Sequence, residues 1–328
     1  MPSFERASNR IVIAGASSLL GAELKSLLEE SRFAGWDLRL VDEELAAGTL
    51  TEAGGEPAVI QPVEEGSFEH ARLVFFTGSL AFTKVNLGAA RAGGATVIDL
   101  SGGSLGEKET RIWYPRAEVK LEKDLNYAVL SAPATVAVAL LDSLSAVGLS
   151  RLGVIFFRPV SEAGRRGIEE LESQTSQLLS MQSMGQAVFD TQVAFGMLNR
   201  YGAASRENLW AIRERICAEV SPLVGQRGVL PSIQVVHAPV FYGYTFAALA
   251  ETTSVTTREK LVEACQKAGF HVWENADGPL GNLSTGDSTM HLALPEGSPL
   301  QAWWSWGAVD NFKLPAANAV KLGEKLVA

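Results

Sequence analysis

Two glycines that follow the first apolar strand of the chain have a spacing that suits phosphate binding. Gly15 and Gly21 bound the segment G-A-S-S-L-L-G, which separates an expected strand at 11–14 from a helix. In dinucleotide-binding turns the first glycine permits a tight exit from the strand, and the last permits close packing of the helix on the sheet. Ser18 stands in place of the middle glycine of that pattern. The segment is therefore either a cofactor-binding turn or a tight connection in a Rossmann-like domain that holds no cofactor. Its predicted cofactor contacts are Gly15, Ser17, Ser18, Leu19, Leu20 and Gly21.

Carboxylates at the end of the second expected strand bear on the choice of cofactor. Strand 37–42 ends in Asp42-Glu43-Glu44, about 20 residues beyond Gly21, where a ribose-binding carboxylate is found in such domains. Carboxylates there accept hydrogen bonds from the ribose of NAD and repel the 2′-phosphate of NADP, so NAD is favoured if a dinucleotide binds. The alternative is a solvated acidic turn. Asp42, Thr77 and Ser101 complete the predicted cofactor contacts.

A second turn suits nucleophilic chemistry but carries no nucleophile. An apolar strand at 127–130 runs into an apolar helix at 136–147 through S-A-P-A-T, residues 131–135. A helix N-terminus favours negative charge and lowers the pKa of a thiol placed there. Proline and alanine offer no such group. The two cysteines, Cys217 and Cys265, lie in helix-like segments, and we expect buried structural thiols in a reducing cytoplasm.

The elements that position these turns form two domains. The first is an alternating β/α region, which predicts right-handed crossovers and a parallel sheet. Its expected strands are 11–14, 37–42, 73–77, 95–100 and 127–130, and one of its helices is 84–92. We assign it residues 1–132 together with a C-terminal segment, 312–328, whose helix at 316–326 packs back on it.

Residues 133–311 form the second predicted domain, an α+β domain with a mixed or antiparallel sheet. Its expected strands are 154–160, 233–240, 246–250, 271–273, 289–294 and 301–309, and its helices are 167–184 and 257–268. One sheet face is expected to contain Trp303, Trp304 and Trp306. Such an apolar face needs a cover, either the domain's own helices or another subunit.

Composition excludes several classes of protein. With 328 residues, 47% hydrophobic and 20% charged, the chain is expected to be globular with two domains. The net charge of −9 argues against nucleic acid and anionic membranes as partners. No apolar run reaches the roughly 18 residues of a membrane span, and the polar N-terminus does not look like a signal peptide. We therefore expect a cytoplasmic protein, and no residue pattern predicts a metal site.

Five motifs resemble those of one family. They are G-A-S-S-L-L-G at Gly15, V-S-E-A-G-R-R-G-I-E-E-L at Val160, Q-V-A-F-G-M-L at Gln192, A-P-V-F-Y-G-Y-T at Ala238, and D-N-F-K-L-P-A-A-N-A-V at Asp310. Over nearly its whole length the chain resembles the aspartate-semialdehyde dehydrogenases and, more distantly, N-acetyl-glutamyl-phosphate reductases. The resemblance implies an NADP-binding Rossmann domain, a catalytic and dimerisation domain, and a homodimer. It also implies reductive dephosphorylation of β-aspartyl phosphate through a cysteine thiohemiacetal.

The departures from the family pattern fall on its chemistry. The catalytic thiol corresponds to Pro133, or to Ala134 if the register slips by one, and neither side chain can form a thioester. The general-base histidine corresponds to Tyr244, whose unperturbed pKa near ~10 makes it a poor proton shuttle. The substrate-carboxylate arginine corresponds to His237, which lacks the bidentate fork. The alternative is that His237 and Tyr244 simply fill a vacated pocket.

Four further contacts implied by the resemblance are altered. The phosphate arginine corresponds to Leu105, and the arginine near the 2′-phosphate of NADP to Leu45. The substrate lysine matches Leu209, which follows Glu207, while a catalytic-site glutamine aligns with Arg158, which would restore one positive charge. The pattern resembles the Usg-type paralogues, which share the fold without the active-site set.

The sequence thus predicts a dimeric, two-domain dehydrogenase homologue that has lost the parent activity, because nucleophile, base and substrate arginine act as a unit. Two alternatives stay open. The chain is an active NAD(P)-dependent oxidoreductase that uses no cysteine, with Tyr244 or His237 as proton donor, or it is a regulatory partner that pairs with a true dehydrogenase subunit. An intermediate possibility between these two is a small-molecule sensor, whose Rossmann domain binds a nucleotide without reacting.

Overall fold

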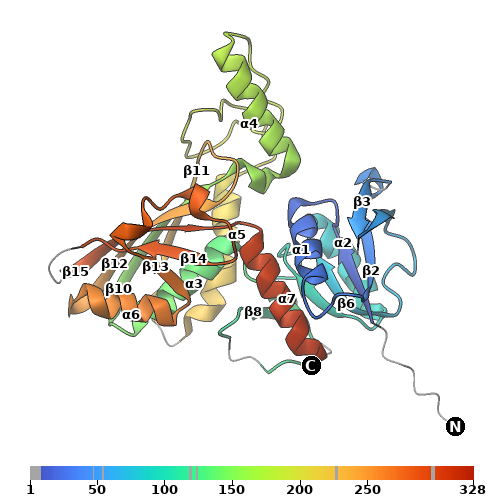
Figure 1. Cartoon of the computed structure of the whole chain (residues 1–328), viewed down its shortest axis with the longest axis horizontal. Helices are drawn as coiled ribbons and strands as arrows, with labels where there is room; N and C mark the ends of the chain where they lie inside the picture. The colour runs from blue at the N-terminus through green and yellow to red at the C-terminus, as the bar shows by residue number, and fades with distance from the viewer. Residues whose placement is uncertain are drawn as a thin grey trace. The chain divides into compact units, whose positions relative to one another are not determined.

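The computed structural model describes residues 9–46, 48–53, 55–117, 120–122, 125–225, 228–296 and 300–328. They form two compact units (Figure 1). The first contains the described residues up to Leu130 together with Pro315–Ala328, and the second contains Ser131–Leu314. Each unit has its own sheet, and each is described by itself below.

The first unit is built on a seven-stranded sheet with the order β5-β2-β1-β6-β7-β9-β8. Every strand pair in it is parallel, which confirms the predicted Rossmann-like sheet. The strands are β1 (Arg10–Ala14), β2 (Asp37–Asp42), β5 (Gln61–Pro62), β6 (Ala71–Phe76), β7 (Thr96–Asp99), β8 (Thr110–Trp113) and β9 (Asn126–Val129). A separate antiparallel hairpin, β3 (Leu50–Ala53) with β4 (Glu56–Val59), and the short strands β5 and β8 have no counterpart in the sequence prediction.

Serine caps set where the helices of the first unit begin. α1 (Leu19–Glu29) follows Ser18, and α2 (Leu80–Ala92) follows Ser79, whose hydroxyl accepts from the backbone N–H of Phe82. That cap starts α2 before the predicted position at residue 84. The C-terminal helix α7 (Lys313–Val327) places Ala316, Ala319 and Leu322, all fully buried, in one core cluster with β1 and β6. A short 3₁₀ turn, η1 (Glu44–Ala46), follows β2.

The second unit is built on a six-stranded sheet with the order β11-β10-β12-β15-β14-β13. The β10–β11 and β13–β14 pairs are parallel and the others antiparallel, so the sheet is mixed. The strands are β10 (Leu149–Arg158), β11 (Ser232–His237), β12 (Tyr244–Thr256), β13 (Phe270–Trp273), β14 (Met290–Ala293) and β15 (Leu300–Val309). The helices α3 (Ala132–Ser145), α5 (Leu209–Val224) and α6 (Arg258–Lys267) pack on it, as Figure 1 shows. Short 3₁₀ turns η4 (Asn275–Asp277) and η5 (Asn282–Ser284) lie before β14.

The prediction that three tryptophans share one face of this sheet is wrong. Trp303 is 2% exposed, whereas Trp304 and Trp306 are 56% and 38% exposed. Successive residues of a strand point to opposite faces, so Trp303 lies on the helix-covered face and the other two on the outer face. Trp306 contacts Phe157 there, with ring centroids 5.6 Å apart.

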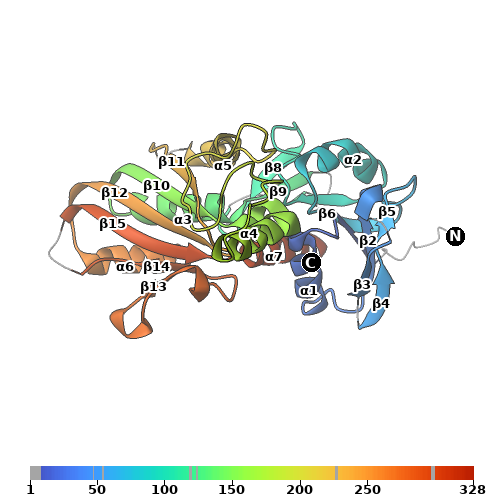
Figure 2. The ribbon, with the colours of Figure 1, turned by 90° about the horizontal axis from the view of Figure 1, so that it is seen from above.

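A long excursion leaves the sheet after β10. It comprises η2 (Val160–Ala163), α4 (Gly164–Leu179) and the loop up to residue 208 (Figures 1 and 2). Two buried side chains of α4 hold that loop. Glu170 accepts from the N–H groups of Val188 and Phe189, and Gln174 accepts from those of Val193 and Ala194. The loop is therefore ordered by α4 and has little regular secondary structure of its own.

Candidate functional site

The two glycines of the predicted phosphate turn are required by close backbone approaches. Gly15 has φ +95°, and a Cβ there would lie 2.1 Å from the backbone nitrogen of Gly78. A Cβ on Gly21 would lie 2.6 Å from the carbonyl oxygen of Gly15. No other residue fits either place. The tight exit from β1 and the close approach of α1 expected for such a turn are both present.

The hydroxyl of Ser18 in the turn and that of the neighbouring Thr77 are both used internally. The Ser18 hydroxyl donates to the carbonyl oxygen of Thr77 at 2.9 Å and accepts from the N–H of Gly21 at 2.9 Å. Thr77 is buried, and its hydroxyl donates to the carbonyl oxygen of Gly15 at 2.9 Å. Within the described part of the chain, the N–H groups of Leu19 and Leu20 at the start of α1 have no hydrogen-bond acceptor. A phosphate would meet those two donors.

Asp42 shapes the same turn from the end of β2. Its carboxylate accepts from the N–H of Ser17 and from the N–H of Glu43, each at 2.8 Å, and the side chain is buried. Glu43 and Glu44, just beyond, are exposed. The side chain of Leu45, the position implied for a 2′-phosphate arginine, lies outside the described residues. Of the three carboxylates at this strand end, one is thus bonded within the turn and two face solvent.

The turn after β7 is organised by a residue whose role the sequence analysis did not assign. The carboxylate of Asp99, fully buried, accepts from the backbone N–H groups of Ser101, Gly102 and Ser104 and from the hydroxyls of Ser101 and Ser104. Ser101, a predicted cofactor contact, is thus buried and engaged. Leu105 follows at the rim of this turn, half-buried. An aspartate followed by small polar residues is the sequence signal of such a turn.

The start of α3 lacks a nucleophile but contains a carboxylate. Ala132, Pro133 and Ala134 are all buried, and the helix begins at Ala132, earlier than the predicted 136, because proline is tolerated in a first turn. The backbone N–H of Ser131 donates to the carboxylate of Glu219, from α5, at 2.7 Å. No sequence pattern signals this contact, since 88 residues separate the two.

Arg158, at the end of β10, is the centre of a buried hydrogen-bond network. The side chain is 3% exposed. Its Nη2 lies 2.7 Å from a carboxylate oxygen of Glu207, and its Nη1 donates to the hydroxyl of Tyr201 at 3.1 Å. The Tyr201 oxygen lies 3.3 Å from Nδ1 of His237, whose Nε2 lies 3.3 Å from the carbonyl oxygen of Val193. Arg158 and His237, two predicted positions, are thus linked through Tyr201, a residue that the sequence analysis missed.

Burial fixes the protonation of this network. It lowers the pKa of His237 to about 4, so the imidazole is neutral at pH 7. Because the Val193 carbonyl can only accept, Nε2 carries the hydrogen and Nδ1 accepts from the Tyr201 hydroxyl. Burial also raises the pKa of Tyr201, which keeps its proton. Although burial opposes its charge, neighbouring Tyr201 and Glu207 hold the pKa of Arg158 above the ordinary value.

Tyr244, at the start of β12, is also fully enclosed. Burial raises its pKa well above the usual value, and its hydroxyl bonds to the carboxylate of Glu162. The same carboxylate accepts from the amide of Asn311 at 3.0 Å, and the Asn311 side-chain oxygen accepts from the N–H of Gly243. The tyrosine is a phenol held by a carboxylate and does not titrate near neutral pH.

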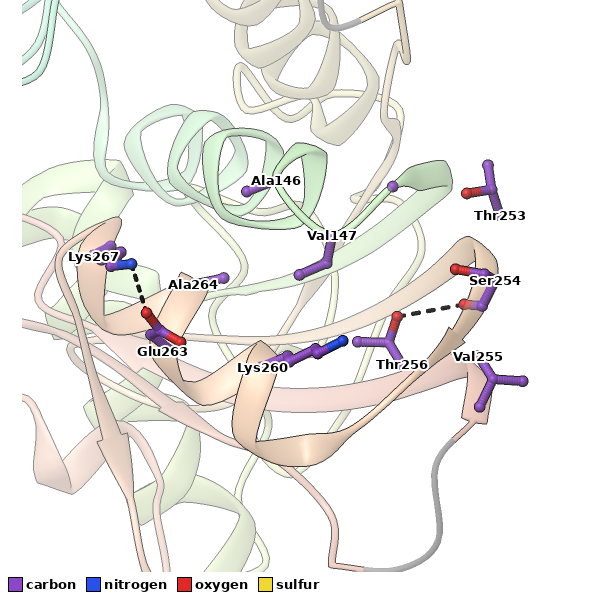
Figure 3. A pocket seen from close by; sticks show the side chains of 11 residues that line it. Ala146, Val147, Thr253, Ser254, Val255, Thr256, Lys260, Glu263, Ala264 and Lys267 are labelled. Atoms are coloured by element: carbon purple, nitrogen blue, oxygen red, sulfur yellow. Dashed lines mark hydrogen bonds and ion pairs between the residues drawn. The ribbon is translucent and has the colours of Figure 1, made fainter.

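Two cavities open in the second unit. One, of about 640 Å³, is lined by Tyr201, Glu207 and Leu209, together with Arg200 and Trp210. It therefore adjoins the network of Arg158. The other, of about 550 Å³, lies between the end of α3, the end of β12 and α6, and Lys267 pairs there with Glu263 at 2.6 Å (Figure 3). None of the predicted site residues lines this second cavity.

The described residues contain no helix long and apolar enough to cross a bilayer. They also contain no group of three or more His, Cys, Asp or Glu side chains placed to hold a metal ion. Both cysteines are free thiols, and burial raises the pKa of Cys265 to about 11.

Comparison with known proteins gives consistent matches. The sequence profile of the semialdehyde dehydrogenase dimerisation domain matches residues 140–291. USG-1 protein homologues from Azotobacter vinelandii and Pseudomonas aeruginosa are each 29% identical, over 97% of this chain and 97% of their own length. Aspartate-semialdehyde dehydrogenase 2 of Vibrio cholerae is 23% identical with the same coverage. The structure of a probable aspartate-semialdehyde dehydrogenase from P. aeruginosa matches with a TM-score of 0.87 and 26% identity, over 97% of this chain and 98% of that chain.

Proposed function

We propose that the chain is a dimeric homologue of the aspartate-semialdehyde dehydrogenases, to which it is similar over nearly its whole length, and that it does not perform their covalent reaction. The observation that carries the proposal is the start of α3, where Pro133 and Ala134 are buried in the first turn and neither has a nucleophilic atom. Without a thiolate, neither the thioester acyl-enzyme nor the thiohemiacetal can form.

The hydrogen bonds and the protonation of His237 and Tyr244 support the same proposal. Both ring nitrogens of His237 are engaged, one by Tyr201 and one by Val193. Tyr244 has a strongly raised pKa and is bonded to Glu162. Neither group is poised to exchange a proton at neutral pH. The cation of the pocket, Arg158, is already paired with Glu207. Direct hydride transfer to a carbonyl, with His237 or Tyr244 as the proton donor, is therefore less well supported than the loss of activity.

The test is an activity assay on the purified protein. Aspartate semialdehyde, phosphate and NADP or NAD are supplied, and the formation of reduced cofactor is followed. We expect a rate at least about 10⁴-fold below that of an active dehydrogenase of the family, because residues that act as a unit are missing together. A rate within about 100-fold of the active enzyme would overturn the proposal.

For the cofactor, we propose NAD in preference to NADP. Support comes from the exposed carboxylates of Glu43 and Glu44 at the end of β2, which disfavour a 2′-phosphate, and from the open N–H groups at the start of α1. Thermal unfolding with each dinucleotide tests this, since a ligand at 100 times its Kd stabilises a fold by about 2.7 kcal/mol. We expect NAD to bind at least about tenfold more tightly than NADP. Equal affinities, tighter NADP binding or no binding of either contradicts the preference.

For assembly, we propose a homodimer through the outer sheet face of the second unit. Support comes from the match to a dimerisation domain and from the apolar character of this face, which presents Ile155, Phe157, Leu249, Trp304 and Trp306. Patches of this kind need a cover.

Light scattering tests the homodimer, and it should give twice the chain mass for the wild type and the chain mass for Trp304→Asp. Trp210→Asp is the control and should stay dimeric, since it replaces a tryptophan of α5 that is 66% exposed, against 56% for Trp304. A monomeric wild type refutes the proposal.

A further inference from the structure

The start of α3 is occupied by a carboxylate of the chain itself. Glu219, from the middle of α5, is 2% exposed, and its Oε2 accepts from the backbone N–H of Ser131 at 2.7 Å. Ser131 does not cap the helix with its own side chain; its hydroxyl is buried without a partner among the described residues. The negative charge that a helix N-terminus favours is thus supplied from within the protein.

The other oxygen of this carboxylate is paired with an arginine of the same helix. Arg215, one helical turn earlier on α5, donates through Nε to Oε1 of Glu219 at 3.1 Å, and its side chain is 37% exposed. The oxygen that faces α3 is therefore held by a neutral backbone N–H, while the guanidinium reaches solvent. Pro133 contributes no N–H to the first turn, which leaves the terminus with fewer donors for a second anion.

We propose that Glu219 closes the first turn of α3 to any further negative charge, including a thiolate at position 133 or 134. A negative charge there would lie near a buried carboxylate and not at an open helix terminus. Because like charges at short range repel, the carboxylate disfavours the ionised form of the thiol. The inference goes beyond the proposed loss of the nucleophile, since it predicts that restoring a cysteine alone gives an inert thiol.

The test introduces the thiol and varies the carboxylate. Ala134→Cys is made in a chain whose own cysteines are removed by Cys217→Ala and Cys265→Ala, with and without Glu219→Gln. The thiol pKa is measured from thiolate absorbance, which needs no access for a reagent. We expect a pKa at or above about 8.5 with Glu219 present and a value lower by about one to two units with Glu219→Gln.

The controls separate charge from structure. Pro133→Cys repeats the measurement at the neighbouring position, so the outcome does not depend on one substitution folding well. Glu214→Gln, an exposed residue of the same helix that pairs with Arg213, should leave the thiol pKa unchanged. A pKa below 7 with Glu219 present, or values equal with and without Glu219→Gln, would overturn the inference. Because no turnover is measured, the result is independent of the activity assay.

Discussion

Arg158 and His237 are direct partners across the parallel pairing of β10 and β11. The family resemblance implies an arginine at the position of His237 and a glutamine at that of Arg158. The positive charge thus lies on the neighbouring strand, at the register position paired with His237. Both side chains meet at the hydroxyl of Tyr201, which accepts from the arginine and donates to the histidine. The positive charge of Arg158 is thus committed to Glu207 and to the protein's own network.

Truncating Arg158 tests how strongly this network supports the fold. Arg158→Ala leaves the Glu207 carboxylate and the Tyr201 hydroxyl without their donor, and breaking a buried pair from one side costs about 3 kcal/mol or more. We expect a loss of that order in the free energy of unfolding, measured by urea denaturation. Arg151→Ala removes an exposed arginine that pairs with Glu251, and it should cost less than about 0.5 kcal/mol. Equal effects of the two substitutions would contradict the assignment.

His237 makes the stability of the second unit depend on pH. Its pKa is lowered by burial to about 4 in the folded chain, against about 6.5 when unfolded. Between these two pH values the imidazole takes up a proton in the unfolded chain but not in the folded chain. The contribution of His237 to the free energy of unfolding is therefore fully present above pH 6.5 and is lost as the pH falls toward 4. We expect the free energy of unfolding to be about 2 kcal/mol lower at pH 5 than at pH 7 from this group.

The matched variant is His237→Gln, which keeps a donor and an acceptor but does not titrate. Its free energy of unfolding should vary less between pH 5 and pH 7 than that of the wild type. The dependence that remains belongs to other groups, such as His291, whose pKa is also lowered by burial. An unchanged pH dependence in His237→Gln would rule out the neutral, buried imidazole.

Local features were predictable from the sequence, and long-range contacts were not. The glycine turn after β1 and the parallel sheet follow from spacing and from strand–helix alternation, both of which are encoded within a few residues. The contact between Ser131 and Glu219 joins residues 88 positions apart, and no pattern signals it. α5 was expected only as a helix-like segment around Cys217, although its buried apolar residues Leu209, Ile216 and Val220 recur at helical spacing.

Gly21 tests the packing of α1 on the sheet. Gly21→Ala places a Cβ 2.6 Å from the carbonyl oxygen of Gly15, so helix and strand must separate, and we expect a loss of about 2 kcal/mol or more. Gly88→Ala is the matched control within α2, where a Cβ meets nothing within 4 Å. Alanine is favoured over glycine in a helix, so this variant should gain about 0.5–1 kcal/mol. Chemical denaturation measures both, and changes of the same sign would refute the close approach.

Gln174 tests whether α4 orders the loop that leads to the Arg158 network. Its side-chain oxygen accepts from the N–H groups of Val193 and Ala194, and its amide donates to the carbonyls of Gly185 and Thr191. Gln174→Leu keeps the volume but leaves those buried backbone groups unpaired, which costs about 1–3 kcal/mol for each. We expect faster hydrogen exchange and proteolysis throughout residues 185–194. Gln177→Leu, on the same helix with a single contact to the N–H of Gly185, should affect only the start of the loop. The same loop carries Val193, which contacts the imidazole of His237. Burial is the main cause of the lowered pKa of His237, so water that enters when the loop opens in Gln174→Leu should raise this pKa toward its ordinary value. NMR titration of His237 would reveal the rise, and a purely local role of Gln174 would not produce it.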